Sequence, residues 1–255
     1  TDVGNNVVTL IDGHNSVTAG ADNDTITANN GTNTIDAGDG NDKIDLNNGT
    51  NSVVAGSGVD TITVASGTNT IDAGEGADTI SLTGGSNTVL AGSGNDTITA
   101  LGGTNTIATD MGDNTVVLNA GTNNVTANAG ADTITATSGT NTISAGDGND
   151  TLNINGGTNS VVAGSGVDTI TVASGTNTID AGVGADLITL NGGDNTIYGA
   201  SGADSITAND GANVIDAGTE NDTITANSGT NTIDAGAGDD KIDLNDGTNS
   251  VAAGS

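Results

Sequence analysis

The chain has 255 residues, with 42 Gly, 32 acidic residues and two Lys but no Arg, and its formal net charge at pH 7 is −30. Such a charge repels nucleic-acid phosphates and anionic membrane surfaces, and no apolar run approaches the roughly 18 residues of a transmembrane helix, so we expect no nucleic-acid partner and no membrane insertion. The absence of Cys excludes disulfides and thiolate metal sites.

A repeat of 18 residues runs along the whole sequence. Gly-x-Asn recurs from Gly13/Asn15 to Gly247/Asn249, and an Asp recurs half a period away. A fixed period without insertions is typical of a solenoid, in which each repeat forms one coil. We therefore predict a single β-solenoid repeat domain over residues 1–255, with about 14 coils. The alternative, a disordered acidic polymer, needs no strict register, whereas this chain keeps one for Ile and Val as well as for Asp.

The coil over residues 37–54 illustrates the predicted elements in chain order. Its first half starts with turn-forming residues and ends in a short strand, where Ile44 and Leu46 point to one face. In its second half, Val53 points inward and Val54 points outward. Gly, Asn and Asp suit the turns, and Ile, Val and Thr suit strands. The predicted fold class is therefore all-β, a parallel β-roll or β-solenoid with 18 residues and two short strands per coil.

The first half-coil resembles the RTX nonapeptide, Gly-Gly-x-Gly-x-Asp-x-apolar-x, of calcium-binding parallel β-rolls. Residues 37–45 show it as Ala-Gly-Asp-Gly-Asn-Asp-Lys-Ile-Asp, with Ala in place of the first Gly. Comparable copies start at Ala55, Ala73, Ala91, Ala145, Ala163, Ala181 and Ala235, and weaker ones at Ala19, Thr109, Ala127, Gly199 and Ala217. The resemblance implies calcium bound between successive coils by turn carbonyls and the Asp carboxylate. It also implies a bacterial protein that leaves the cell by type I secretion.

The recurring Asp residues support calcium binding independently of the resemblance. The candidate metal ligands are Asp24, Asp42, Asp60, Asp78, Asp96, Asp132, Asp150, Asp168, Asp186, Asp204, Asp222 and Asp240, and Asn occupies the remaining slot at Asn114. Carboxylates about 4.8 Å apart repel by about 3.5 kcal/mol at an effective dielectric constant of about 20. Hard oxygen ligands suit Ca²⁺, although solvated counterions are the simpler alternative.

The spacing of these Asp residues predicts about ten calcium ions. Four gaps separate neighbouring Asp residues between Asp24 and Asp96, and six separate those between Asp132 and Asp240. One ion in each of these 4 + 6 gaps adds a charge of +20, which reduces the net charge from −30 to −10. Calcium is therefore expected to be a folding cofactor and not a catalytic one.

The second half-coil departs from the nonapeptide because its Asp slot holds Asn, as at Asn51. A stack of neutral Asn side chains can link amide to carbonyl from coil to coil without a cation. We interpret this edge as an Asn ladder that closes the turn, with calcium on the Asp edge alone. The alternative is calcium on both edges.

Two outward faces suggest contacts with other molecules. One face carries Thr-Ile-Thr, as at Thr61/Thr63, and resembles the ice-binding faces of some antifreeze proteins, although charged pairs such as Lys43/Asp45 interrupt it. The other face carries a row of apolar residues at multiples of 36 residues: Val54, Leu90, Val162 and Tyr198. Such a row often marks a contact surface, although scattered apolar surface residues are also normal.

The ends of the sequence and a duplication suggest that length is useful. Residues 49–74 and 157–182 are identical, and the sequence stops at Ala253-Gly254-Ser255, where another coil would start. Thr1-Asp2-Val3-Gly4 has no basic or apolar segment typical of a signal peptide. We expect a segment of a longer array, or a unit that associates laterally or end to end.

The sequence offers few residues that could serve in catalysis. His14 is the sole His and is expected to be a solvated turn residue, and no nucleophile has a base in reach. We expect no enzyme and no small-molecule substrate. The predicted function is a calcium-stabilised structural β-roll of a secreted or cell-surface protein, such as a fibre, surface layer or adhesin stalk, that self-associates. The alternatives are an ice-binding β-solenoid and the repeat module of a secreted toxin or enzyme.

Overall fold

The structure is a computed structural model that describes residues 3–254, so Thr1, Asp2 and Ser255 of the two chain ends lie outside it. The described residues form 28 β-strands and no helix. In particular, none of these residues forms a helix long and apolar enough to cross a membrane. The chain divides into two compact units, Thr1–Asn128 and Ala129–Ser255, and each is described by itself. The prediction of a single domain stays a prediction.

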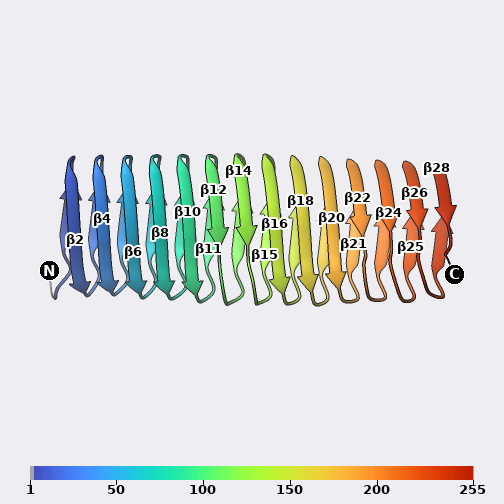
Figure 1. Cartoon of the computed structure of the whole chain (residues 1–255), viewed down its shortest axis with the longest axis horizontal. Helices are drawn as coiled ribbons and strands as arrows, with labels where there is room; N and C mark the ends of the chain where they lie inside the picture. The colour runs from blue at the N-terminus through green and yellow to red at the C-terminus, as the bar shows by residue number, and fades with distance from the viewer. Residues whose placement is uncertain (1–2, 255) are drawn as a thin grey trace. The chain divides into compact units, whose positions relative to one another are not determined.

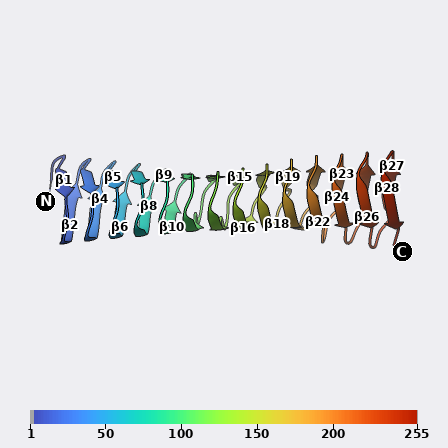
Figure 2. The same cartoon turned by 90° about the horizontal axis from the view of Figure 1, so that it is seen from above.

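The first unit consists of two parallel sheets whose strands follow one another in chain order (Figure 1). One sheet holds the short odd-numbered strands β1 Val7–Leu10, β3 Thr25–Ala28, β5 Lys43–Leu46, β7 Thr61–Val64, β9 Thr79–Leu82, β11 Thr97–Ala100 and β13 Thr115–Leu118. The other sheet holds β2 His14–Ala21, β4 Thr32–Asp39, β6 Thr50–Ser57, β8 Thr68–Glu75, β10 Ser86–Ser93, β12 Thr104–Ala108 and β14 Thr122–Thr126. Seen from above, the odd-numbered and even-numbered strands form two separate layers (Figure 2).

The second unit repeats this architecture. Its odd-numbered sheet holds β15 Thr133–Ala136, β17 Thr151–Ile154, β19 Thr169–Val172, β21 Leu187–Leu190, β23 Ser205–Ala208, β25 Thr223–Ala226 and β27 Lys241–Leu244. Its even-numbered sheet holds β16 Thr140–Asp147, β18 Thr158–Ser165, β20 Thr176–Val183, β22 Asp194–Tyr198, β24 Ala212–Asp216, β26 Thr230–Asp234 and β28 Thr248–Ala252. Consecutive strands within each sheet are two elements apart in the chain, so every coil supplies one strand to each layer.

The register and the core confirm the predicted β-solenoid. Ile44 pairs with Ile62 in the neighbouring strand, so the strands match at a spacing of 18 residues. The inward positions alternate as predicted, because Ile44, Leu46, Val53 and Ala55 are all buried. Each coil places few apolar side chains in the core, and each is covered by the coils above and below it. Stacking of coils therefore makes the core, as repeat architectures require.

The second strand of many coils is longer than predicted. In β6 it runs from Thr50 to Ser57, so Asn51 lies inside the strand instead of in a turn. Its far end also pairs, because Gly56 is opposite Gly38 and Ser57 is opposite Asp39 in β4. Gly and Asn are usually turn residues, but here main-chain hydrogen bonds between identical coils outweigh that preference.

The turns on the Asp side depend on glycine at a position of close approach. Gly58 has a φ of 136°, a backbone conformation that other residues rarely adopt. A Cβ atom at Gly58 would lie 1.9 Å from the carbonyl oxygen of Gly40 in the preceding coil. Glycine therefore lets these turns stack closely.

Candidate metal centre

The structure brings the predicted Asp residues together as one ladder in each unit. Each Asp directly precedes an odd-numbered strand, as Asp42 precedes β5, so the coil repeat stacks the carboxylates. In the first unit the ladder runs from Asp24 to Asp96, and in the second unit it runs from Asp132 to Asp240. All of them except Asp240 are at most 2% exposed. These carboxylates are therefore buried, which the sequence pattern did not indicate.

One oxygen of each carboxylate is used to hold neighbouring coils together. The main-chain N–H of Asp42 donates to Oδ1 of Asp60 at 2.7 Å, and the N–H of Asp60 donates to Oδ1 of Asp78 at 2.7 Å. The same bond recurs in the second unit, where the N–H of Asp150 donates to Oδ1 of Asp168 at 2.8 Å. Asp60 and Asp168 therefore each donate and accept along the stack.

The second carboxylate oxygen, Oδ2, is buried and has no hydrogen-bond partner. This holds for Asp24, Asp42, Asp60, Asp78, Asp96, Asp150, Asp168, Asp186, Asp204, Asp222 and Asp240. Burying a charged acceptor without a partner costs several kcal/mol, and most buried polar atoms in proteins are paired. A repeated series of such oxygens indicates that the ladder needs a cation.

Two coils hold Asn instead of Asp at the ladder position, and their hydrogen bonds indicate which group an Asp Oδ2 faces there. Asn114 accepts the N–H of Asp96 through Oδ1 at 2.9 Å, as an Asp would, and its Nδ2 donates to the carbonyl of Gly112 at 2.8 Å. Asn6 likewise donates from Nδ2 to the carbonyl of Gly4. An Asp in this slot therefore directs an acceptor toward the carbonyl of the residue two positions before it, which is Gly except at Asp22 and Glu220. Two acceptors that face each other require a metal cation or a proton between them.

The donor set fits calcium better than other metals. It consists of carboxylate and carbonyl oxygens, which are hard ligands of the kind that Ca²⁺ prefers in numbers of six to eight. Among residues 3–254, no group of three or more His, Cys, Asp or Glu side chains is placed to hold a metal ion. A calcium ion here would thus take most of its ligands from turn carbonyls and from carboxylates of two successive coils.

Burial changes the acidity of the ladder. It raises the pKa of Asp60 to about 6, although the N–H of Asp42 opposes the shift and the neighbouring carboxylates of Asp78 and Asp42 add to it. In the second unit, burial raises the pKa of Asp204 to about 7, with the same opposition from the N–H of Asp186. The ladder is therefore poorly suited to carry its full negative charge at neutral pH without a counterion.

The opposite edge of each coil carries an Asn ladder that is satisfied internally. Asn33 donates from Nδ2 to Oδ1 of Asn51 at 2.7 Å and to the carbonyl of Asn30 at 3.1 Å. Asn159 makes the same two bonds in the second unit, to Asn177 and Gly156. No Asn within the described part of the chain has a buried side-chain atom without a partner. These contacts favour the interpretation that calcium binds on the Asp edge alone.

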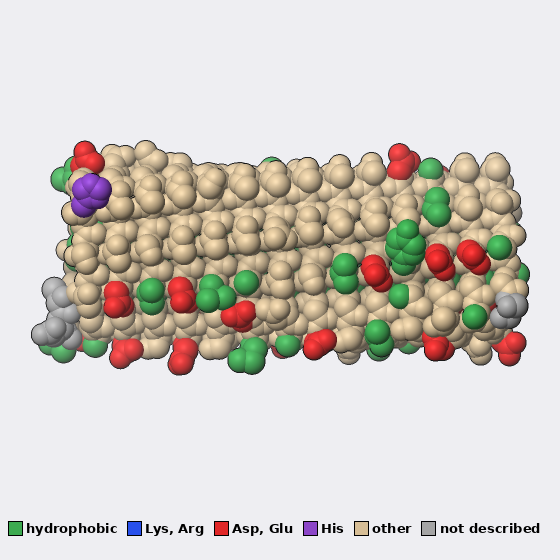
Figure 3. Space-filling view, viewed as in Figure 1, with side chains coloured by type: hydrophobic (Ala, Val, Ile, Leu, Met, Phe, Trp, Pro, Cys, Tyr) green, Lys and Arg blue, Asp and Glu red, His purple; other side chains and the backbone are tan. Residues whose placement is uncertain are grey.

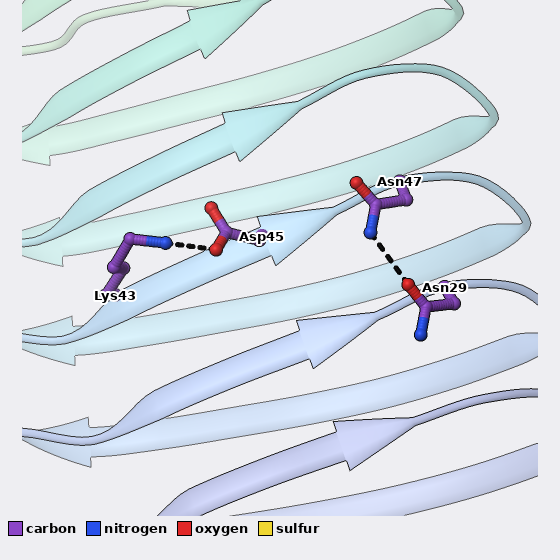
Figure 4. Close-up of polar contacts among 4 residues, drawn as sticks. All are labelled: Asn29, Lys43, Asp45 and Asn47. Carbon is purple, nitrogen blue, oxygen red and sulfur yellow. Dashed lines mark hydrogen bonds and ion pairs between the residues drawn. The ribbon is translucent and has the colours of Figure 1, made fainter.

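The outward faces follow the predicted pattern. Lys43 forms an ion pair with Asp45 on β5, next to a hydrogen bond of 2.8 Å from Asn47 Nδ2 to Asn29 Oδ1 (Figure 4). Lys241 pairs with Asp243 in the second unit. The apolar row is exposed, at 44% for Val54, 37% for Leu90, 44% for Val162 and 44% for Tyr198. His14 is also exposed, at the start of β2 and not in a turn.

Comparisons with known proteins agree with this geometry. The family model of the RTX calcium-binding nonapeptide repeat (4 copies) matches residues 11–44, 45–80, 82–116, 118–152, 154–188, 189–224 and 216–251. No curated protein matches the chain. Among solved structures, the chain is similar to a hyperactive, Ca²⁺-dependent, β-helical antifreeze protein from an Antarctic bacterium, with a TM-score of 0.73 and 23% identity over 91% of this chain and 83% of that one.

Proposed function

Because the chain belongs to the family of RTX calcium-binding nonapeptide repeats, we propose that it is a structural β-roll that calcium stabilises, in a secreted or cell-surface bacterial protein. Within that role it acts as a fibre, surface layer or adhesin stalk. RTX repeats are typical of secreted proteins, which supports an extracellular location. Type I secretion is the proposed route.

The observation that supports this proposal is the series of buried Oδ2 atoms without partners in both Asp ladders. The proposed ligands are the Asp residues from Asp24 to Asp96 and from Asp132 to Asp240, together with carbonyls of their turns. Bound calcium neutralises the ladder and joins each coil to the next. One ion for each gap between neighbouring Asp residues gives the proposed total of about ten.

Chelation tests this role. Saturating calcium at about 100 times its dissociation constant stabilises the fold by about 2.7 kcal/mol per site, so its removal from many sites should unfold the chain. Circular dichroism in excess chelator at pH 7 should show loss of the sheet signal, which returns when calcium is added. A sheet signal that stays unchanged in chelator would refute the proposed role.

We further propose that calcium-loaded copies associate through the apolar row. Val54, Leu90, Val162 and Tyr198 offer small, repeated contacts, which bind weakly one by one and tightly as a long array. Calcium also lowers the repulsion between copies. Light scattering at high concentration with calcium should show association, and replacement of all four residues by Ser should abolish it while the sheet signal remains. A strictly monomeric wild-type chain would contradict this part of the proposal.

Ice binding is the second candidate function, and the similarity in fold to a Ca²⁺-dependent antifreeze protein supports it. Ice binding requires a flat, regular and uncharged face. The Thr-Ile-Thr face of the odd-numbered strands meets this requirement poorly, since Lys43 and Asp45 in β5 and Lys241 and Asp243 in β27 interrupt it. If ice binding is the function, another face has to provide the surface.

A further inference from the structure

The even-numbered sheet of the first unit exposes a second threonine array that is more regular than the Thr-Ile-Thr face. Its strands share the pattern Thr-Asn-Thr or a close variant, with the Asn buried and both neighbours exposed. We call this surface the threonine face. It has two ranks, one of Thr32, Thr50, Thr68, Ser86, Thr104 and Thr122, and one of Thr34, Ser52, Thr70, Thr88, Thr106 and Asn124.

Strand pairing and the Asn ladder fix the spacing of the threonine face. Thr68 is opposite Thr50 on one side and Ser86 on the other, and Thr70 has the same relation to Ser52 and Thr88. Between the ranks, Nδ2 of each buried Asn donates to the next Asn at 2.7–2.8 Å. The strand geometry then places ranks about 6.6 Å apart and coils about 4.8 Å apart. Threonine is also stiff at χ1, so little side-chain freedom remains to be lost on binding.

The threonine face is uncharged on a chain whose net charge is −30. Neither rank contains a charged side chain from β4 to β14. Figure 3 shows these rows as continuous tan surface, while acidic side chains lie along the rows beside them. In the second unit, β16, β18 and β20 keep the same pattern, but Asp194 in β22 and then Ala212 and Val214 in β24 interrupt it. The first unit carries the pattern without such an interruption from β4 to β14, so the proposal concerns the first unit.

The chemistry of the threonine face matches a repetitive, uncharged partner. Protein interfaces are enriched in aromatic residues, Met and Arg at their centres, and the two ranks contain none of these. They also offer no aromatic ring on which a sugar could stack. What they offer is a regular lattice of hydroxyl and methyl groups at fixed spacing, which complements an ordered layer of water molecules.

We propose that the threonine face of the first unit binds ice. The proposal deepens the second candidate function and rests on it, because it assigns the surface that would perform that function. The surface proposed to contact ice is therefore the Thr-Asn-Thr rows of the even-numbered strands, and not the Thr-Ile-Thr rows of the odd-numbered strands.

A pair of matched variants of the full chain, loaded with calcium, tests the assignment. Thr70→Lys places a long, charged side chain in the middle of the threonine face. Thr61→Lys places the same side chain at an exposed position of β7 in the opposite sheet. Circular dichroism first checks that both variants keep the sheet signal. The fraction of each protein that a slowly growing ice surface takes up is then compared with that of the wild type.

We expect ice to take up the wild type and Thr61→Lys equally and to take up Thr70→Lys several-fold less. Equal uptake of both variants, or loss in Thr61→Lys alone, overturns the assignment of the face but leaves ice binding intact. A wild-type chain that ice excludes overturns the ice-binding function and this proposal with it. In that case, two other measurements would identify the partner. Association seen by light scattering and lost in Thr70→Lys would indicate a second copy of the chain. Co-sedimentation with crystalline cellulose that is lost in Thr70→Lys would indicate a neutral polysaccharide.

Discussion

At the scale of single residues, the choice between Asp and Asn at one slot decides whether a coil junction needs a metal. Asn114 supplies from its own Nδ2 the donor that the carbonyl of Gly112 requires. Asp96, one coil earlier, presents Oδ2 in the equivalent place and finds no partner for it. The exchange of one side-chain nitrogen for an oxygen therefore decides whether the buried polar atoms of a coil junction are all paired without a cation.

This comparison predicts the behaviour of Asp168→Asn. The variant should lose calcium affinity in the two gaps that flank Asp168, toward Asp150 and Asp186. In chelator, however, it should be more stable than the wild type by about 1–3 kcal/mol, because a satisfied amide replaces a buried unpaired oxygen. Calorimetry counts the ions, and urea unfolding in chelator measures the stability.

Asn159→Ala is the matched control from the opposite edge. It removes three hydrogen bonds from the Asn ladder, two that Asn159 donates and one that it accepts from Asn141, so it should lower the free energy of unfolding by about 1–3 kcal/mol and leave the number of bound ions unchanged. A wild-type count near twice the proposed ten, or a count that falls in Asn159→Ala, would show that the Asn edge binds calcium as well.

Protonation of the Asp ladder at low pH should partly substitute for calcium in stabilising the fold. Burial raises the pKa of Asp60 from 3.8 in an unfolded chain to about 6 in the folded one, so between these values the folded state binds more protons. The free energy of unfolding in chelator therefore falls as pH rises through this window. We expect the sheet signal in chelator to be present near pH 4, to weaken through pH 6 and to be lost by pH 7, while calcium removes this dependence. Greater stability in chelator at pH 7 than at pH 4 would contradict the burial of the ladder.

At the scale of elements, main-chain pairing between identical coils extends strands beyond the limits that composition suggests. The alternation of Ile44 and Leu46 predicted β5 correctly, because side-chain period depends only on which residues are apolar. The end of β6 was missed, because Gly56 and Ser57 have the composition of a turn. Nothing in a single coil indicates that the same residues in the next coil will pair with them.

The close stacking of turns predicts that Gly→Ala substitutions at different positions will lower the thermal stability by different amounts. Gly58→Ala should lower the thermal midpoint of the calcium-loaded chain strongly, because φ is 136° and the new Cβ would lie 1.9 Å from the carbonyl oxygen of Gly40. Gly102→Ala is the control, since Gly102 has no positive φ and its Cβ would approach the carbonyl oxygen of Thr83 only to 3.3 Å. Thermal unfolding followed by circular dichroism compares the two. A loss of stability in Gly102→Ala equal to that in Gly58→Ala would contradict this role of the turn glycines.

At the scale of the whole molecule, one repeated coil makes the core, the metal ladder and the outward faces together. The repeat of 18 residues predicted the solenoid and the positions of the Asp residues, because both follow from spacing alone. Spacing could not predict that a carboxylate such as that of Asp60 has one oxygen paired and one buried without a partner, since that depends on how turns stack. Likewise, the Thr-Asn-Thr rows were passed over because Asn51 and its equivalents were assigned to turns.

A crystal structure grown with calcium, with ions located by their anomalous scattering, tests the metal assignment most directly. We expect one ion in each gap between neighbouring Asp residues within both ladders, in contact with Oδ2. We expect no ion between Asp96 and Asn114, and none along the Asn ladder. Gaps that contain only water at saturating calcium, or ions along the Asn ladder, would contradict the proposed metal centre.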